Sequence, residues 1–188
     1  LELVKNMESD LADEKLPAAG FEDEELKSLA KILSTGKLIE ENWKFFGSIE
    51  HYNDMITQLF APRIDFMIRF FDEKVSDENT KDFFGRYIKE CYKMLNFVSN
   101  YYKMRAEKRS RFLNSIINKD LDLKFHDLTL SQKAILLLNS VRGVSCVLVG
   151  MRKEKYVEDV LKILNEKDIM NAEEIIRNVS EEIITAET

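Results

Sequence analysis

Residues that form turns are scarce in this chain. Its 188 residues include only 2 Pro and 6 Gly. A sandwich or barrel of many short β-strands needs a turn about every 8–12 residues, so the composition excludes these folds. Hydrophobic residues make up 45% of the chain and charged residues 33%, which is typical of a folded domain with a core. We therefore expect a mainly α-helical protein, a bundle of about six to eight helices.

Apolar residues at helical spacing predict where these helices lie. The pattern over residues 23–33 predicts a helix that Gly36 ends. A broad apolar stripe over residues 48–71 predicts a longer helix, which Pro62 should kink or divide because proline lacks the backbone N–H. Apolar residues three and four apart over residues 76–118 predict a helix of about 35–40 residues, unless Gly85 or the basic stretch near its end breaks it. Two long antiparallel helices of this kind would form the trunk of a bundle.

Charge is distributed unevenly along the chain. Residues 1–41 hold 11 acidic and 5 basic residues, and we interpret residues 1–20 as a weakly ordered acidic lead-in. No apolar run approaches the roughly 20 residues that span a bilayer, so we expect no membrane segment. A basic cluster follows two tyrosines, and aromatic residues beside cations can bind single-stranded nucleic acid. Because the chain is acidic overall, we favour the interpretation of this cluster as a solvated helix face, and we expect no nucleic-acid partner. The cluster consists of Lys103, Arg105, Lys108, Arg109 and Arg111.

Few side chains suggest catalysis or metal binding. Cys91 and Cys146 are far apart among apolar neighbours, which is typical of reduced core residues in a cytoplasmic protein. His51 and His126 stand in no triad and have no metal ligands at the required spacing, so we expect no catalytic residues and no metal site. The aromatic residues around Trp43 are expected to fill the core, or else to line a groove between helices.

One short segment departs from the helical pattern. Residues 144–149 are β-branched and almost wholly apolar, and Gly150 follows them. This pattern predicts a single buried parallel strand between two helices. A strand that ends in glycine and leads into a helix places backbone N–H groups where phosphates bind, and Arg152 and Lys153 add two cations there. The alternative is that these cations are solvated residues in the first turn of an ordinary helix.

Residues 128–183 resemble the end of an aldo/keto reductase, a TIM barrel that uses NADPH. Residues 128–161 read LTLSQKAILLLNSVRGVSCVLVGMRKEKYVEDVL, which follows the family's penultimate helix, last strand with its glycine, and final helix. The resemblance implies that the turn after the strand contacts the adenosine phosphate of NADPH and that an acidic residue lies near the adenine. The implied cofactor-binding residues are Gly150, Met151, Arg152, Lys153, Glu158 and Asp159.

The rest of the barrel is missing from this sequence. A complete TIM barrel needs about 250 residues and eight strands. The resemblance also implies that the catalytic Asp, Tyr, Lys and His lie on earlier strands, so we expect no hydride transfer by this chain alone. Residues 1–125 are interpreted as a helical insertion or appended domain, and residues 126–188 as the last units of the barrel. Because the chain starts at Leu1 without a methionine, we expect it to be the C-terminal part of a longer protein.

Two kinds of partner and two functions follow from this interpretation. An orphan strand at residues 144–149 would pair with the upstream barrel part of the same protein, or with a second copy in a homodimer. Without such a neighbour it must pack against helices or become irregular. The expected function is the C-terminal helical region of an NADPH-dependent oxidoreductase that is not catalytic by itself. The alternative is a non-catalytic helical module for protein–protein interaction.

Overall fold

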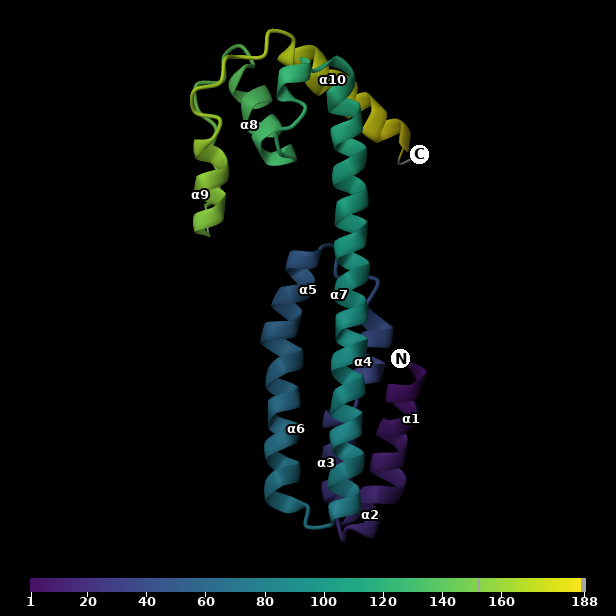
Figure 1. Ribbon diagram of the computed structural model, residues 1–188. Coiled ribbons are helices and arrows are strands. Elements are labelled where there is room, and N and C mark those ends of the chain that lie inside the picture. The colour runs from purple at the N-terminus through teal and green to yellow at the C-terminus, as the bar shows by residue number, and fades with distance from the viewer. Residues whose placement is uncertain (152, 187–188) are drawn as a thin grey trace. The chain divides into compact units, whose positions relative to one another are not determined.

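The computed structural model describes residues 1–151 and 153–186, and every regular element in these residues is helical (Figure 1). The predicted fold class is therefore confirmed, with eight helices of eight residues or more in this part of the chain. The α-helices are α1 (Glu2–Asp10), α2 (Leu16–Ala18), α3 (Asp23–Ile32), α4 (Thr35–Asn42), α5 (Ile49–Met55), α6 (Ala61–Lys74), α7 (Glu78–Asp120), α8 (Leu130–Asn139), α9 (Glu154–Leu161) and α10 (Ala172–Ala186).

The chain divides into two compact units, unit 1 (Leu1–Ala106) and unit 2 (Glu107–Thr188). The boundary falls inside α7, whereas the sequence pattern placed it near residue 125, at the polar connection. The two positions differ because the last turns of α7 belong to the core of unit 2. Ile117 and Leu121 are buried there together with Leu136 of α8 and Ile175 of α10.

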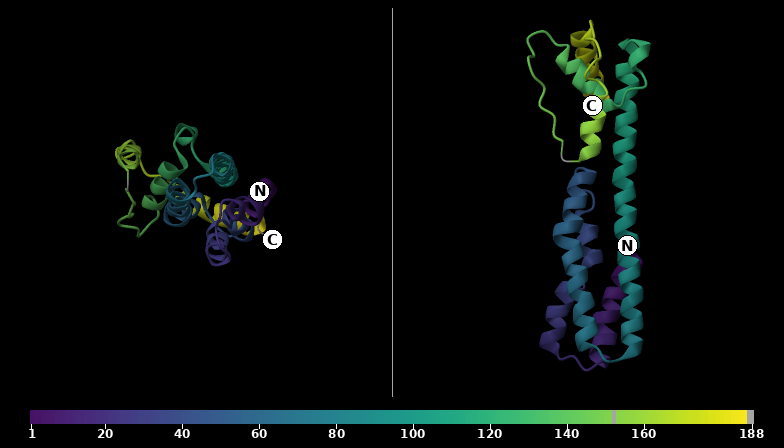
Figure 2. Two further views of the ribbon diagram at one scale, coloured as in Figure 1. Left: turned by 90° about the horizontal axis from the view of Figure 1, so that it is seen from below. Right: turned by 60° about the vertical axis from the view of Figure 1, so that its left-hand side comes forward.

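Two long antiparallel helical segments form the trunk of unit 1. The segment that ends in α6 runs alongside the first half of α7 in both views (Figures 1 and 2). Phe71 of α6 stacks on Phe84 of α7 with ring centroids 3.6 Å apart, and both rings are buried. α7 is a single helix of 43 residues, so neither Gly85 nor the basic cluster interrupts it. The predicted long helix is confirmed.

Pro62 interrupts the other long segment as predicted. A π-helix at Ile56–Phe60 separates α5 from α6, and Pro62 lies in the first turn of α6. Proline cannot donate a backbone hydrogen bond, and its ring crowds the preceding turn. The wider π turn accommodates both effects, so the chain stays helical on either side of the proline.

The prediction that residues 1–20 are weakly ordered is wrong. They form α1, a π-helix at Leu11–Lys15 and the short α2. Four apolar side chains of this segment are buried in the core of unit 1, namely Val4, Met7, Leu11 and Leu16. The acidic side chains between them concealed the amphipathic pattern, which packing against the other helices stabilises.

The prediction that Gly36 ends the helix over residues 23–33 is wrong. Gly36 lies in the first turn of α4, where its backbone passes close to α1. A Cβ atom at Gly36 would lie 3.0 Å from Cγ of Lys5 and 3.1 Å from Cγ1 of Val4. The glycine therefore serves a close contact between two helices and not a helix terminus.

Unit 2 begins after the last turns of α7 with a 3-10 turn at Leu123–Phe125 and then α8. Thr129 caps α8, because its hydroxyl accepts a hydrogen bond from the N–H of Gln132, and the Gln132 side chain accepts one from the N–H of Thr129. An apolar cluster of α8 and α10 then forms the core of this unit. Its members include Leu136, Leu137, Ala172 and Ile175.

The prediction of a buried strand at residues 144–149 is wrong, whereas the alternative that this segment becomes irregular without sheet neighbours is confirmed. These residues lie in an irregular segment between α8 and α9, and most of their side chains are exposed. Cys146 is exposed as well, so its assignment to the core is also wrong, whereas Cys91 is buried as predicted. A strand needs a neighbouring strand for its backbone hydrogen bonds, and the described part of this chain supplies none.

Candidate functional site

The non-helical segment between α8 and α9 is described over residues 140–151 and 153, and it contains Gly150, Met151 and Lys153, three of the positions that the resemblance assigned to a cofactor. Val147 and Val149 are half-buried, while Cys146 and Leu148 on the alternate positions are exposed. Leu148 is 94% exposed, which is unusual for a leucine in a run of apolar residues. This alternation over residues 146–149 gives the segment one sheltered side and one open apolar side.

The backbone of this segment is as open as its side chains. The N–H of Val144 donates to the carbonyl of Val141 at 3.1 Å. Residues 145–150 have no backbone hydrogen-bond partner among the residues that the structure describes. The segment therefore presents free N–H and carbonyl groups beside exposed apolar side chains, as an unpaired edge strand does.

The described residues of the turn after the segment, Gly150, Met151 and Lys153, are exposed. Gly150 is exposed, and a Cβ atom there would meet no atom within 4 Å. Met151 is 45% exposed, and Lys153 is an exposed residue at the N-cap of α9. Arg152 lies outside the described residues. The turn thus offers accessible backbone and a cation at the N-terminus of a helix, the combination that attracts phosphate.

The two acidic positions assigned to the adenine have different surroundings. Glu158 is exposed. The carboxylate of Asp159 accepts hydrogen bonds from the Thr129 hydroxyl at 3.1 Å and from Nε2 of Gln132 at 3.1 Å. Nε2 of Gln132 also donates to the carbonyl of Asp159 at 2.8 Å. Asp159 therefore ties α9 to the N-terminus of α8, a role that the sequence did not reveal.

The histidines and the basic cluster are placed as expected for structural and solvated residues. Nε2 of His126 lies 2.9 Å from the carbonyl of Leu121, and His51 packs edge-on against the Phe46 ring at 6.0 Å. The basic side chains at residues 103–111 of α7 are all exposed. No group of three or more possible metal-ligating side chains occurs in residues 1–151 and 153–186.

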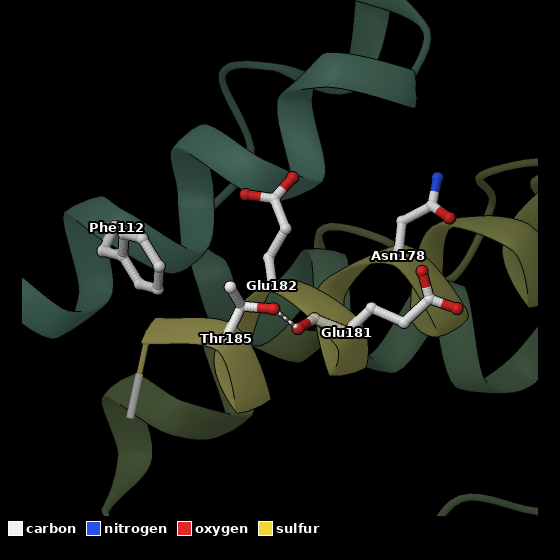
Figure 3. A pocket seen from close by; sticks show the side chains of 5 residues that line it. All are labelled: Phe112, Asn178, Glu181, Glu182 and Thr185. Atoms are coloured by element: carbon white, nitrogen blue, oxygen red, sulfur yellow. Dashed lines mark hydrogen bonds between the residues drawn. The ribbon is translucent and has the colours of Figure 1, made fainter. Parts of the chain in front are cut away.

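Sequence reasoning missed a shallow hollow between the last turns of α7 and α10 (Figure 3). Its volume is about 480 Å³, and it is lined by Phe112, Asn178, Glu181, Glu182 and Thr185. Several of its polar side chains are engaged in contacts between helices or within α10. The Glu182 carboxylate pairs with Nζ of Lys119 at 2.5 Å, and Nδ2 of Asn178 donates to the Asp120 carboxylate at 2.8 Å.

The Thr185 hydroxyl donates to the backbone carbonyl of Glu181, as the dashed line in Figure 3 shows. The hollow presents neither a nucleophile beside a base nor a cation for an anionic substrate. We therefore interpret it as the polar margin of the packing between α7 and α10, and the open segment at residues 144–153 remains the better candidate site.

Comparison with known proteins adds no relative: no family model, no curated protein and no solved structure matches this chain. None of the helices that the structure describes combines the length and the hydropathy of a membrane span.

Proposed function

We propose that unit 2 contributes the last helix–strand–helix segment of an aldo/keto reductase-like, NADPH-dependent oxidoreductase of the cytoplasm. In this proposal residues 144–149 pair with a strand of the upstream barrel part of the same protein. The single observation that carries the proposal is the open, mostly apolar segment at residues 145–149, whose backbone groups have no hydrogen-bond partner among the described residues. Such a segment exposes an aggregation-prone edge unless a sheet covers it.

The helices around the segment support this proposal. α8 and α9 are joined by the hydrogen bonds of Asp159, so the two helices that flank the segment are held together without a sheet. Val147 and Val149 are half-buried, as residues on the helix-facing side of a barrel strand would be. Cys146 and Leu148 would then turn toward the barrel interior, which is packed with apolar side chains.

The turn at residues 150–153 would hold the adenosine phosphate of NADPH. Gly150 leaves room for a phosphate to approach the backbone, and Lys153 supplies a positive charge at the start of α9. When bound, NADPH supplies the hydride, and the groups that act on the substrate would belong to the upstream part of the protein. The residues described here would bind and orient the cofactor only.

Cofactor titration of the complete protein tests this proposal. Lys153→Ala should weaken NADPH binding about tenfold, the effect of losing one charge-assisted contact to phosphate. Binding of NADH, which lacks the second phosphate on the adenosine, should change much less. Lys162→Ala is the matched control, because Lys162 is an exposed lysine near the other end of α9. Equal effects of the two substitutions, or no NADPH binding at all, would contradict the proposal.

The second candidate function is a non-catalytic helical module for protein–protein interaction. It is favoured by an apolar groove in unit 1, lined in part by Trp43, Phe97 and Tyr101. Under this function the complete protein would bind neither NADPH nor NADH, and no substitution at residues 150–153 would alter its affinity for a partner.

A further inference from the structure

The groove in unit 1 lies between α4 and α7 and is open to solvent. Its volume is about 270 Å³, and its walls are almost wholly apolar. Two large aromatic side chains that line it are well exposed: Phe97 at 77% and Tyr101 at 42%. Exposed apolar side chains that gather around one concave site mark a surface for binding.

The aromatic wall of the groove is held rigidly. The rings of Trp43 and Tyr101 meet edge to face with centroids 5.3 Å apart, and Tyr101 contacts Tyr102 in the same way. Tyr102 is buried, and its hydroxyl donates to the carbonyl of Trp43 at 2.5 Å. A wall that is already ordered loses little side-chain entropy when a ligand binds.

Two cations lie next to this wall. Lys44 follows Trp43 directly, and its Nζ lies 5.5 Å from the centroid of the Trp43 ring. Arg105 is four residues after Tyr101 on α7, which places the two side chains on one face of the helix. Both cations are exposed, and neither forms an ion pair with any residue that the structure describes.

Some carboxylates of α1, α4 and α7 form ion pairs. Glu2 and Glu40 share Nζ of Lys5, at 3.4 Å and 2.9 Å, and Glu90 pairs with Nζ of Lys93 at 2.5 Å. Lys44 and Arg105 are therefore two cations beside the groove that no carboxylate of the described residues pairs. A ligand with carboxylates next to an apolar face complements these two cations.

We propose that this groove binds an amphipathic α-helix of a partner protein. A large apolar side chain of that helix fills the space between Trp43 and Phe97, and its carboxylates face Lys44 and Arg105. A groove between two helices has the form that an amphipathic helix occupies, with anchor residues three and four positions apart. The site belongs to unit 1, so it does not depend on the NADPH site proposed for unit 2.

The chain's single tryptophan lies in the groove and reports its occupation directly. The probe is a synthetic helical peptide with leucines at every third or fourth position and glutamates beside them, and a second peptide carries lysines in place of the glutamates. The glutamate peptide should shift the Trp43 emission to shorter wavelength and bind more tightly than the lysine peptide, with the difference shrinking at high salt.

Three variants make this test specific. Phe97→Ser should weaken the glutamate peptide about tenfold or more, because a central aromatic anchor is lost. Phe66→Ser is the matched control on α6, where the ring is 51% exposed and does not line the groove. Arg105→Glu should weaken the glutamate peptide and strengthen the lysine peptide. All three side chains are exposed, so folding should be preserved.

Several results would overturn the proposal. One is an unchanged Trp43 emission with both peptides. Another is equal binding of the two peptides, which would show that the cations play no part. Self-association that depends on protein concentration and is abolished by Phe97→Ser would assign the groove to a second copy of the chain. Binding to anionic vesicles that is lost in Phe97→Ser, without peptide binding, would assign it to a lipid surface.

Discussion

Glu8 of α1 is buried, and its carboxyl group accepts a hydrogen bond from a backbone N–H in the first turn of α4. Its Oε1 accepts a hydrogen bond from the N–H of Gly36 at 2.7 Å and from the Tyr87 hydroxyl at 3.0 Å. The side chain is 8% exposed. Burial raises the pKa of the Glu8 carboxyl above its ordinary value of 4.5, although these hydrogen bonds act in the opposite direction.

The raised pKa of Glu8 gives a pH dependence of stability with a definite sign. Below pH 4.5 the carboxyl is protonated in both the folded and the unfolded chain. As the pH rises, the unfolded chain loses this proton first, so the contribution of Glu8 to the free energy of unfolding falls until the folded pKa is passed. In Glu8→Gln the side chain does not titrate.

We therefore expect the stability of the natural protein relative to Glu8→Gln to decrease between pH 4 and pH 7, as measured by urea unfolding at several pH values. An increase over the same range would mean that the folded pKa of Glu8 is lowered, as it would be if Arg63 dominated its surroundings.

Lys133 is a buried charged residue of unit 2, as Glu8 is of unit 1. It is 1% exposed, and its Nζ donates to Oδ1 of Asn114 and Oδ1 of Asn118, both at 2.9 Å, and to the carbonyl of His126 at 2.8 Å. Three acceptors satisfy the three protons of the ammonium group. The cation thus joins α8 to α7 and to the loop between them.

Replacing Lys133 by methionine should destabilise unit 2. The substitution keeps most of the side-chain volume but leaves three oxygen atoms without their donor, so we expect a loss of about 1–3 kcal/mol in the free energy of unfolding. Thermal unfolding of Lys133→Met measures it, with Lys162→Met as the control at an exposed lysine of the same unit. An equal or higher stability would show that the desolvation of the ammonium group outweighs its hydrogen bonds.

Gly85 and Gly36 both lie inside helices, but the space around their Cα atoms differs. Gly85 lies in α7, is exposed, and would place a Cβ atom in open space. Gly36 lies in α4, where a Cβ atom would meet Val4, Lys5 and the Glu8 carboxylate at 3.0–3.2 Å. The same substitution should therefore have opposite effects at the two positions.

Gly85→Ala should raise the free energy of unfolding by about 0.5–1 kcal/mol, since alanine reduces the entropy of the unfolded chain and favours the helix. Gly36→Ala should lower it by about 1–3 kcal/mol, because α1 and α4 must move apart. Urea unfolding of both variants under one set of conditions measures the pair. A stabilising Gly36→Ala would show that the contact between α1 and α4 is not as close as described.

The sequence predicted elements whose pattern is local. Apolar residues three and four apart predicted α7, and Pro62 predicted the interruption between α5 and α6. Tertiary effects were not predictable in this way. The order of residues 1–20, the close contact at Gly36 and the burial of Lys133 all depend on helices that are distant in the sequence.

The candidate site shows the same limit. Residues 144–149 have the composition of a buried strand, and β-propensity largely reflects packing in a sheet. Because the described residues provide no neighbouring strand, the segment stays irregular and exposed. The glycine and the lysine of the following turn were predicted to be accessible to a phosphate, and both are exposed. The hydrogen bonds of Asp159 involve residues about 30 positions away, and no local pattern indicated them.

The described residues of the molecule form two separate apolar cores. One contains residues of α1 and of α3 to α7 in unit 1, and the other contains residues of α8, α10 and the last turns of α7 in unit 2. Residues 103–111 of α7 are all exposed, so this part of the helix contributes to neither core. Unfolding of one core therefore does not by itself remove the buried apolar contacts of the other.

We expect thermal unfolding to occur in two transitions that respond to different substitutions. Ile64→Ala removes a fully buried side chain of unit 1, and Leu137→Ala removes one of unit 2 that is 4% exposed. Each should lower the stability of its own unit by about 2–5 kcal/mol through lost burial and a residual cavity. Differential scanning calorimetry should then show the first substitution moving one transition and the second moving the other. If either substitution shifts both transitions equally, the two cores unfold as one cooperative unit, and α7 transmits stability through its exposed centre.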